Sequence, residues 1–161
     1  MSPRPTGRVR STATGADLVL TRRFRAPIED VWQSVTKSES TARWYGPWEG
    51  EAGPGKTIRV TMAFEEGSPT SSMTIEACEA PRRLVLSSRM AHVELTLRQE
   101  GDTTELEFVH KLTDAKLAGD FGPGWEYYLD NLVAAREDKP LPQFSEYYPA
   151  QKEYYLGDAL K

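Results

Sequence analysis

Apolar side chains recur at helical spacing near the end of the chain. Between residues 121 and 136 they fall on one side of a helical wheel: Phe121, Trp125, Tyr128, Leu129, Leu132 and Val133. This pattern predicts an amphipathic helix with a broad aromatic face. The polar residues of the same stretch are expected on its solvent side: Glu126, Asp130, Asn131 and Arg136. We expect the helix to begin at Gly122-Pro123-Gly124, where a turn and a proline set its direction.

The chain before this helix shows mainly the two-residue period of β-strands. Alternating apolar and polar residues predict strands over residues 17–25, 58–64, 73–78, 84–88, 92–98 and 105–112. The later stretches are separated by short polar turns, which favour an antiparallel meander with one packed and one wet face. The long helix is expected to cover the packed face.

Two short helices are predicted between the first strand and the meander. Residues 26–35 carry Pro27 at the start and acidic side chains in the first turn, both of which suit a helix N-terminus. Residues 38–44 form the second, with Ser38 as a candidate N-cap. The aromatic turn over residues 44–48 then ends it, as a plug in the core or as the rim of a pocket.

Arg22 falls on the apolar parity of the first strand. A buried arginine without a partner is costly. Either the strand is twisted at this point, or Arg22 meets an acidic side chain.

The two ends of the chain differ from the middle. Residues 1–15 are rich in Pro, Arg, Ser, Thr and Gly, and we expect a disordered leader there rather than a nucleic-acid-binding arm. Residues 16–141 are expected to form one domain. The tail over residues 142–161 is too aromatic for a disordered end, with Phe144, Tyr147, Tyr148, Tyr154 and Tyr155. It should dock on its own domain or on a second subunit, with Pro149 opening a short helix.

Composition narrows the class of protein. The 161 residues are 39% hydrophobic with a net charge of −4, which suits one globular domain and argues against nucleic acid as a partner. No apolar run approaches the roughly 20 residues of a membrane span, and we see no signal peptide, so we expect a cytoplasmic protein. One cysteine and two histidines argue against a disulfide or a zinc cluster. No phosphate loop or metal-binding motif occurs, and we expect neither a cofactor nor a metal.

A ligand cavity between sheet and helix can be proposed from parity. Inward sheet positions are Met62, Phe64, Met73, Ile75, Leu86, Leu95, Phe108 and His110, and the helix contributes Trp125, Tyr128, Leu129 and Leu132. Trp44 and Trp48 are candidates to close one end. These residues can also form a solid core, since aromatic and methionine stripes commonly serve packing.

His110 is the strongest single candidate for a catalytic or ligand-orienting residue. It shares the inward parity, and beside Tyr128 it could orient a ligand carbonyl or transfer a proton. The alternative is a neutral core histidine satisfied by one hydrogen bond. Cys78 and His92 fall on the polar parity, where we expect no chemistry from them.

Five stretches in this order resemble a known family. They read FRAPIEDVW (residues 24–32), WYGP (44–47), EAPRRLV (79–85), TELEFVH (104–110) and GPGWEYYL (122–129). They resemble the START-like (Bet v 1-like, SRPBCC) superfamily, in its branch related to the activator of the Hsp90 ATPase, the AHSA1-like domain. The resemblance covers residues 18–141. The family's glycine pair appears only loosely, as Gly53-Pro54-Gly55.

The resemblance implies an α+β helix-grip fold, a curved antiparallel sheet wrapped around a long C-terminal helix with two short helices after the first strand. It also implies members that bind hydrophobic molecules, some cyclases and hydrolases, and others that act through protein partners. We favour binding of a small hydrophobic or aromatic ligand in a cavity between sheet and helix. The alternatives are a cyclase or hydrolase that uses His110, and a protein-interaction module linked to a chaperone. A homodimer in which the tail takes part is a further expectation.

Overall fold

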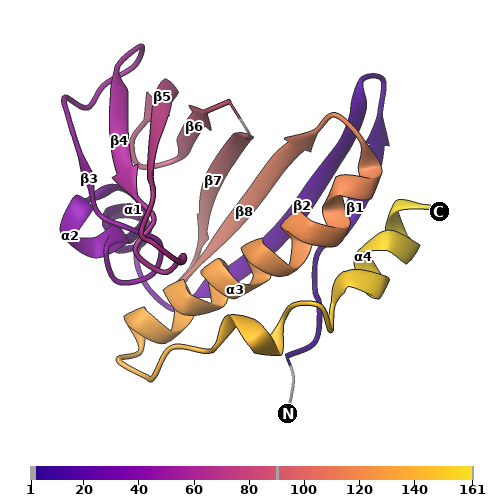
Figure 1. Cartoon of the computed structure of the whole chain (residues 1–161). Helices are drawn as coiled ribbons and strands as arrows, with labels where there is room; N and C mark the ends of the chain where they lie inside the picture. The colour runs from indigo at the N-terminus through magenta and orange to yellow at the C-terminus, as the bar shows by residue number, and fades with distance from the viewer. Residues whose placement is uncertain (1–2, 90, 161) are drawn as a thin grey trace.

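A computed structural model describes residues 3–89 and 91–160, and these residues are organised around one curved antiparallel sheet (Figure 1). Its eight strands take the order β1-β2-β8-β7-β6-β5-β4-β3. The strands are β1 (Arg8–Thr12), β2 (Gly15–Phe24), β3 (Trp48–Glu49), β4 (Thr57–Thr61), β5 (Thr70–Glu79), β6 (Arg83–Ser87), β7 (His92–Glu100) and β8 (Thr103–Leu112).

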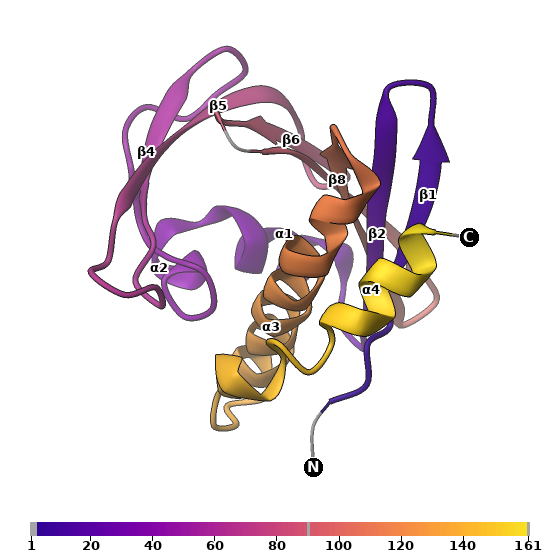
Figure 2. The ribbon, with the colours of Figure 1, turned by 45° about the vertical axis from the view of Figure 1, so that its right-hand side comes forward.

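One long helix crosses the concave side of this sheet (Figures 1 and 2). Two short helices lie under the part of the sheet that β4 and β5 form, and the C-terminal segment runs along the other side of the long helix. The helices are α1 (Ile28–Thr36), α2 (Ser38–Thr41), η1 (Ala115–Leu117), α3 (Ala118–Arg136), η2 (Phe144–Glu146) and α4 (Lys152–Ala159). This is the α+β helix-grip arrangement that the sequence predicted. No helix in the described ranges is long and apolar enough to cross a membrane.

Strand alternation sets which side chains meet α3. On β8 the buried residues are Thr104, Leu106, Phe108, His110 and Leu112, all of one parity. β2 pairs with β8 so that Leu20 stands opposite Phe108. Burying each of the large apolar side chains among them contributes about 2 kcal/mol, and this burial holds the centre of the sheet against the helix.

α3 begins earlier than the sequence predicted. It starts at Ala118, so the glycine-proline-glycine stretch lies inside the helix rather than at its start. The preceding turn is η1, where the Lys116 amide donates to Asp114 Oδ1 at 2.9 Å. Pro123 has no N–H to give to the carbonyl of Gly119, yet the helix continues through it. The start of α3 was predicted too late in the sequence because proline usually stands in the first turn of a helix.

α3 is also buried on a second side. Glu126 is 1% exposed and Asn131 is fully buried, although helical spacing placed both on the solvent side. Asn131 donates to the backbone carbonyl of Trp44 at 3.3 Å, and Glu126 accepts from both ends of the chain. The expectation of a solvent-facing side was therefore wrong for these two residues, because neighbouring segments cover it.

The N-terminal segment is part of the sheet rather than a mobile leader. Arg8–Thr12 forms β1 at the sheet edge, with Val9 paired to Leu18. The amides of Thr6 and Gly7 donate to Glu126 Oε2. Residues 1 and 2 of the expected leader lie outside the described residues.

The C-terminal tail docks on its own chain. Tyr147 is 1% exposed and Tyr155 is fully buried. Tyr147 donates to Asp130 Oδ2 at 2.7 Å, and Tyr155 donates to Glu126 Oε2. The helix that was expected to open at Pro149 begins at Lys152.

Arg22 meets two acids on α3. Its guanidinium lies 2.8 Å from Glu126 Oε1 and 2.9 Å from Asp130 Oδ1. Burial lowers the pKa of Arg22, but the two carboxylates outweigh it and leave that pKa above the ordinary value. The alternative of an acidic partner is thus the correct one.

Candidate functional site

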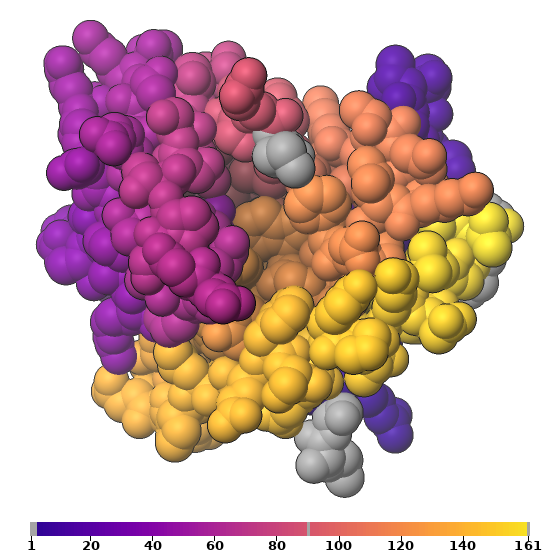
Figure 3. Space-filling view, viewed as in Figure 1, coloured from indigo at the N-terminus to yellow at the C-terminus, as the bar shows by residue number. Residues whose placement is uncertain are grey.

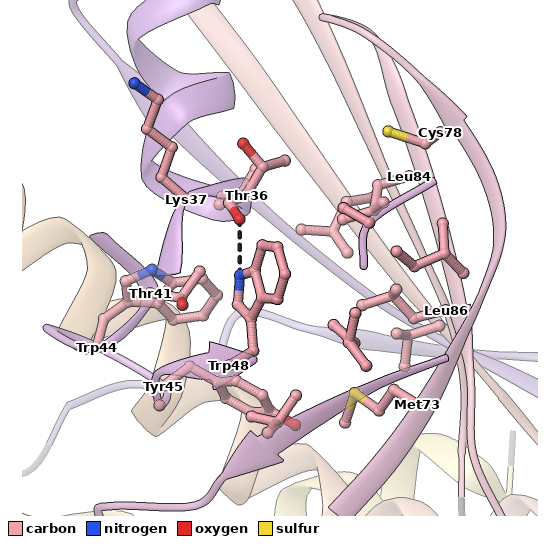
Figure 4. A pocket seen from close by; sticks show the side chains of 18 of the residues that line it. Thr36, Lys37, Thr41, Trp44, Tyr45, Trp48, Met73, Cys78, Leu84 and Leu86 are labelled. Atoms are coloured by element: carbon pink, nitrogen blue, oxygen red, sulfur yellow. Dashed lines mark hydrogen bonds between the residues drawn. The ribbon is translucent and has the colours of Figure 1, made fainter. Parts of the chain in front are cut away.

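An apolar cavity of about 310 Å³ lies between the sheet, the α1–α2 segment and α3 (Figure 4). We call it the inner cavity. Nine of the predicted ligand-binding residues line it: Trp44, Trp48, Met73, Ile75, Leu86, Leu95, Phe108, Trp125 and Leu129. Ile58, Val60, Leu84 and Val93 add further apolar wall.

A second cavity of about 670 Å³ opens beside it, and we call it the outer cavity. It lies between α3, the segment that joins β4 to β5, and η2. Figure 3 shows a hollow on this face between β4–β5 and α3. Five predicted residues line it, two of which also line the inner cavity: Met62, Phe64, Met73, Trp125 and Tyr128.

Three side chains are shared by both cavities: Tyr45, Met73 and Trp125. The ring of Tyr45 stacks on that of Trp125 with centroids 5.8 Å apart, and it meets Tyr128 edge-on at 4.8 Å. These aromatic contacts build the partition between the two spaces.

The aromatic turn after α2 is held by hydrogen bonds to α1 and α2. Trp44 Nε1 donates to the Ser34 carbonyl at 2.8 Å. Trp48 Nε1 donates to the Thr36 carbonyl, also at 2.8 Å (Figure 4). Ser38 does not cap α2 as expected, because its hydroxyl bonds the backbone of Trp48. The indole N–H groups are satisfied in this way, which leaves the ring faces to line the cavity.

Gly46 allows this turn to approach the sheet. A Cβ at this position would lie 1.9 Å from the carbonyl oxygen of Thr61. Only glycine permits such a close backbone approach.

The inner cavity has few polar groups to offer a ligand. The hydroxyl of Thr36 donates to the Trp32 carbonyl, and that of Thr41 donates to the Ser38 carbonyl. The Lys37 amine points away from the other lining residues (Figure 4). The Tyr45 phenol stays protonated near neutral pH, because burial and then the charge of Glu65 raise its pKa.

Tyr128 and Glu65 form a hydrogen-bonded pair on the outer cavity. The Tyr128 hydroxyl donates to Glu65 Oε2 at 2.7 Å. Burial first, and then this hydrogen bond, raise the pKa of Tyr128. The phenol therefore remains a donor that orients the carboxylate.

His110 lies outside both cavities, although parity pointed it inward. Its Nδ1 accepts from Trp125 Nε1 at 3.0 Å, and its ring packs edge-on against Phe121 with centroids 4.6 Å apart. Burial, and then the charge of His92, lower the pKa of His110 to about 4. It is a neutral core histidine at physiological pH, and it accepts from the Trp125 indole rather than lining either cavity.

Leu132 also lies outside both cavities. It is fully buried on α3, within the hydrophobic core. The helical spacing placed it correctly inside the molecule, but spacing alone does not separate cavity wall from packed core.

Cys78 lines the inner cavity, although strict alternation placed it outward. Ile75 pairs with Leu86 whereas Ala77 pairs with Val85, so Glu76 is an extra residue on β5. Such a bulge reverses the parity of the residues that follow it. No feature of the local sequence indicated the bulge.

Tyr45 and Glu65 were not among the residues predicted for the site. Tyr45 belongs to the aromatic turn, whereas Glu65 belongs to a polar turn that was interpreted as solvated. In the described ranges, no group of three or more His, Cys, Asp or Glu residues could hold a metal ion.

Comparisons with known proteins agree with this architecture. The family model described as Activator of Hsp90 ATPase homolog 1-like protein matches residues 25–137. No curated protein matches the sequence. The crystal structure of CalU16 from Micromonospora echinospora superposes with a TM-score of 0.78 at 26% identity, covering 98% of each chain. That similarity therefore extends over β1 and α4, beyond the span of the family match.

Two further structures show the same fold at lower identity. EF2215 from Enterococcus faecalis, a conserved protein of unknown function, has a TM-score of 0.77 at 16% identity, covering 96% of this chain and 90% of that one. DynU16, a putative protein in the dynemicin biosynthetic locus, has a TM-score of 0.66 at 19% identity. The match covers 83% of this chain and 50% of that one.

Proposed function

The chain belongs to the Activator of Hsp90 ATPase homolog 1-like family, and from that premise we propose that it binds a small hydrophobic or aromatic molecule between the sheet and α3. The observation that carries the proposal is the inner cavity of about 310 Å³ with its almost wholly apolar wall. An engineered cavity of about 150 Å³ already takes up benzene. The inner cavity has room for a ligand of about two fused rings.

The chemistry of the wall supports an aromatic ligand. Trp44, Trp48 and Trp125 line the inner cavity, and the indole N–H groups of all three are already hydrogen bonded. They offer ring surface rather than donors, which suits an apolar partner.

The other two hypotheses receive no specific support. His110 faces neither cavity and is engaged with Trp125, so the geometry does not support His110 as the proton-transfer group of a cyclase or hydrolase. The aromatic tail suggested a protein partner or a homodimer. Its residues Tyr147 and Tyr155 instead donate hydrogen bonds to α3 of the same chain.

Calorimetric titration with naphthol, a neutral two-ring aromatic, tests the proposal. Leu86→Trp should fill the inner cavity and weaken binding at least about tenfold, since Leu86 lines it. Val109→Trp is the matched control, because Val109 stands on the opposite parity of β8, between the inward residues Phe108 and His110. Circular dichroism checks the fold of both variants. Equal binding by Leu86→Trp and wild type would contradict the proposed place of the ligand.

A further inference from the structure

The outer cavity combines aromatic rings with carboxylates. We propose that it recognises a positively charged amine, so that the ligand is an aromatic molecule that carries an ammonium group. This inference rests on the proposed function, because the aromatic part of the ligand occupies the inner cavity.

Rings from four separate segments surround the outer cavity. They come from the turn after α2, from the segment that joins β4 to β5, from α3 and from η2, and they are Tyr45, Phe64, Phe121, Trp125, Tyr127, Tyr128 and Phe144. Neighbouring rings stand at angles to one another: Tyr127 meets Tyr128 at 5.4 Å and 52°, and meets Phe144 at 5.5 Å and 76°. Rings set at such angles present faces from several directions. Ring faces attract cations, and aromatic enclosures of this kind suit ammonium groups.

The charged side chains of the outer cavity are all acidic. Glu65, Glu66 and Asp120 line it, and no Lys, Arg or His among the described residues does. Asp120 already has Lys152 at 3.5 Å. Among the described residues, by contrast, neither Glu65 nor Glu66 takes part in an ion pair. These two carboxylates are available to a cation.

Glu65 is held in place for this role. Tyr128 donates to one of its oxygens at 2.7 Å, which leaves the other oxygen for a ligand. Because the Tyr128 phenol stays neutral, the pair keeps the full negative charge of the carboxylate. A hydrogen-bonded carboxylate beside aromatic faces can attract an ammonium ion in two ways, through its negative charge and through the cation–π interaction with the rings.

The two cavities thus differ in the ligand group that each one suits. Within the part of the chain that the structure describes, the wall of the inner cavity has no acidic residue, whereas that of the outer cavity has three. They meet at Tyr45, Met73 and Trp125. A ligand with rings on one side of this partition and an ammonium group on the other satisfies both. A carboxylate or phosphate at the outer end would face like charges.

The test uses three probes with the same naphthyl group and ethylene linker. They end in trimethylammonium, in its neutral tert-butyl isostere, or in a carboxylate. Calorimetric titration of the full chain should show the ammonium probe binding about tenfold tighter than the isostere, and the carboxylate binding weakest. The Glu65→Gln/Glu66→Gln double variant should reduce the ammonium preference to within about threefold of the isostere. Two exposed loop residues are changed, so the fold is not at risk.

Two further variants separate charge from rings. Glu107→Gln removes a carboxylate from the exposed face of β8, away from both cavities. This substitution should leave the preference for the ammonium probe over the isostere unchanged. Phe144→Leu keeps an apolar side chain but removes a ring, and should weaken the ammonium probe severalfold while the isostere binds as before.

Each outcome decides between the two proposals. Equal binding of the ammonium probe and the isostere overturns the amine site and leaves the apolar cavity intact. Tightest binding of the carboxylate also overturns it. Failure of all three probes to bind overturns the ligand-binding function itself. An ammonium preference that survives the double glutamine variant overturns the role of these carboxylates.

Discussion

At the scale of single residues, His110 shows how burial sets a protonation state. Its ring accepts a hydrogen bond from Trp125 through Nδ1, which requires that nitrogen to be unprotonated. Protonation would break this bond and place a charge in the core. Burial, and then the charge of His92, lower the pKa of His110 to about 4.

The pH dependence of stability follows with a definite sign. The folded-state pKa lies below the ordinary value of 6.5, so the unfolded chain binds more protons between about pH 6.5 and 4. The contribution to the free energy of unfolding is full above pH 6.5 and is lost as pH falls toward 4. At about 1.4 kcal/mol per pKa unit, the loss is on the order of 3 kcal/mol.

Urea unfolding at pH 7.5, 6 and 5 measures this loss. His110→Gln keeps an acceptor for Trp125 without a titrating group, and its stability should fall less over the same range. Parallel curves for the variant and the wild type would assign the acid sensitivity to other groups.

At the scale of elements, α3 depends on where its glycines lie. A Cβ on Gly122 would come within 2.5 Å of the Tyr155 ring, so the docking of α4 requires glycine there. A Cβ on Gly124 would meet nothing within 4 Å. The two positions stand two residues apart on the same helix but face different surroundings.

Gly122→Ala and Gly124→Ala should therefore act in opposite directions. Gly122→Ala should lower the free energy of unfolding by about 2 kcal/mol, since the Tyr155 ring must shift. Gly124→Ala should raise it by about 0.5–1 kcal/mol, since alanine favours the helix. Thermal unfolding of both variants gives the comparison, and a loss of similar size in both would mean that α4 is not packed against Gly122.

These elements also show how far sequence reasoning reaches. Six of the eight strands and the inward side of β8 followed from the two-residue period, because a sheet with one packed face imposes it, whereas β1 and β3 were not predicted. Glu126 was predicted to face solvent because helical spacing describes a single helix and carries no information about the segments that pack against it. Cys78 was assigned outward because a single extra residue on β5 reverses parity. The local pattern of apolar residues predicts the helices and strands and their buried faces. The segments that pack over these elements, and the bulges within them, depend on the whole fold.

At the scale of the whole molecule, Glu126 joins distant parts of the chain. It accepts from Thr6 and Gly7 near the N-terminus, from Arg22 on β2 and from Tyr155 on α4. Removing one partner of a buried ion pair leaves an uncompensated charge, which costs more than replacing both.

Arg22→Met should lower the free energy of unfolding by about 3 kcal/mol. Adding Glu126→Gln should recover part of that loss, because the remaining group is then neutral and still hydrogen bonds to the amides. Urea unfolding of the two single variants and the double variant measures the coupling. Strictly additive effects would show that Arg22 and Glu126 do not stabilise each other.

The junction of the two chain ends bears on the order of events during synthesis. Val9 on β1 donates to Asp158 on α4, and the Pro3 carbonyl accepts from Gln151. During translation, residues 3–9 thus acquire these partners only after residues 151–158 have been synthesised. The nascent chain can build its meander as it is translated, but β1 gains its support from α4 only once α4 has emerged.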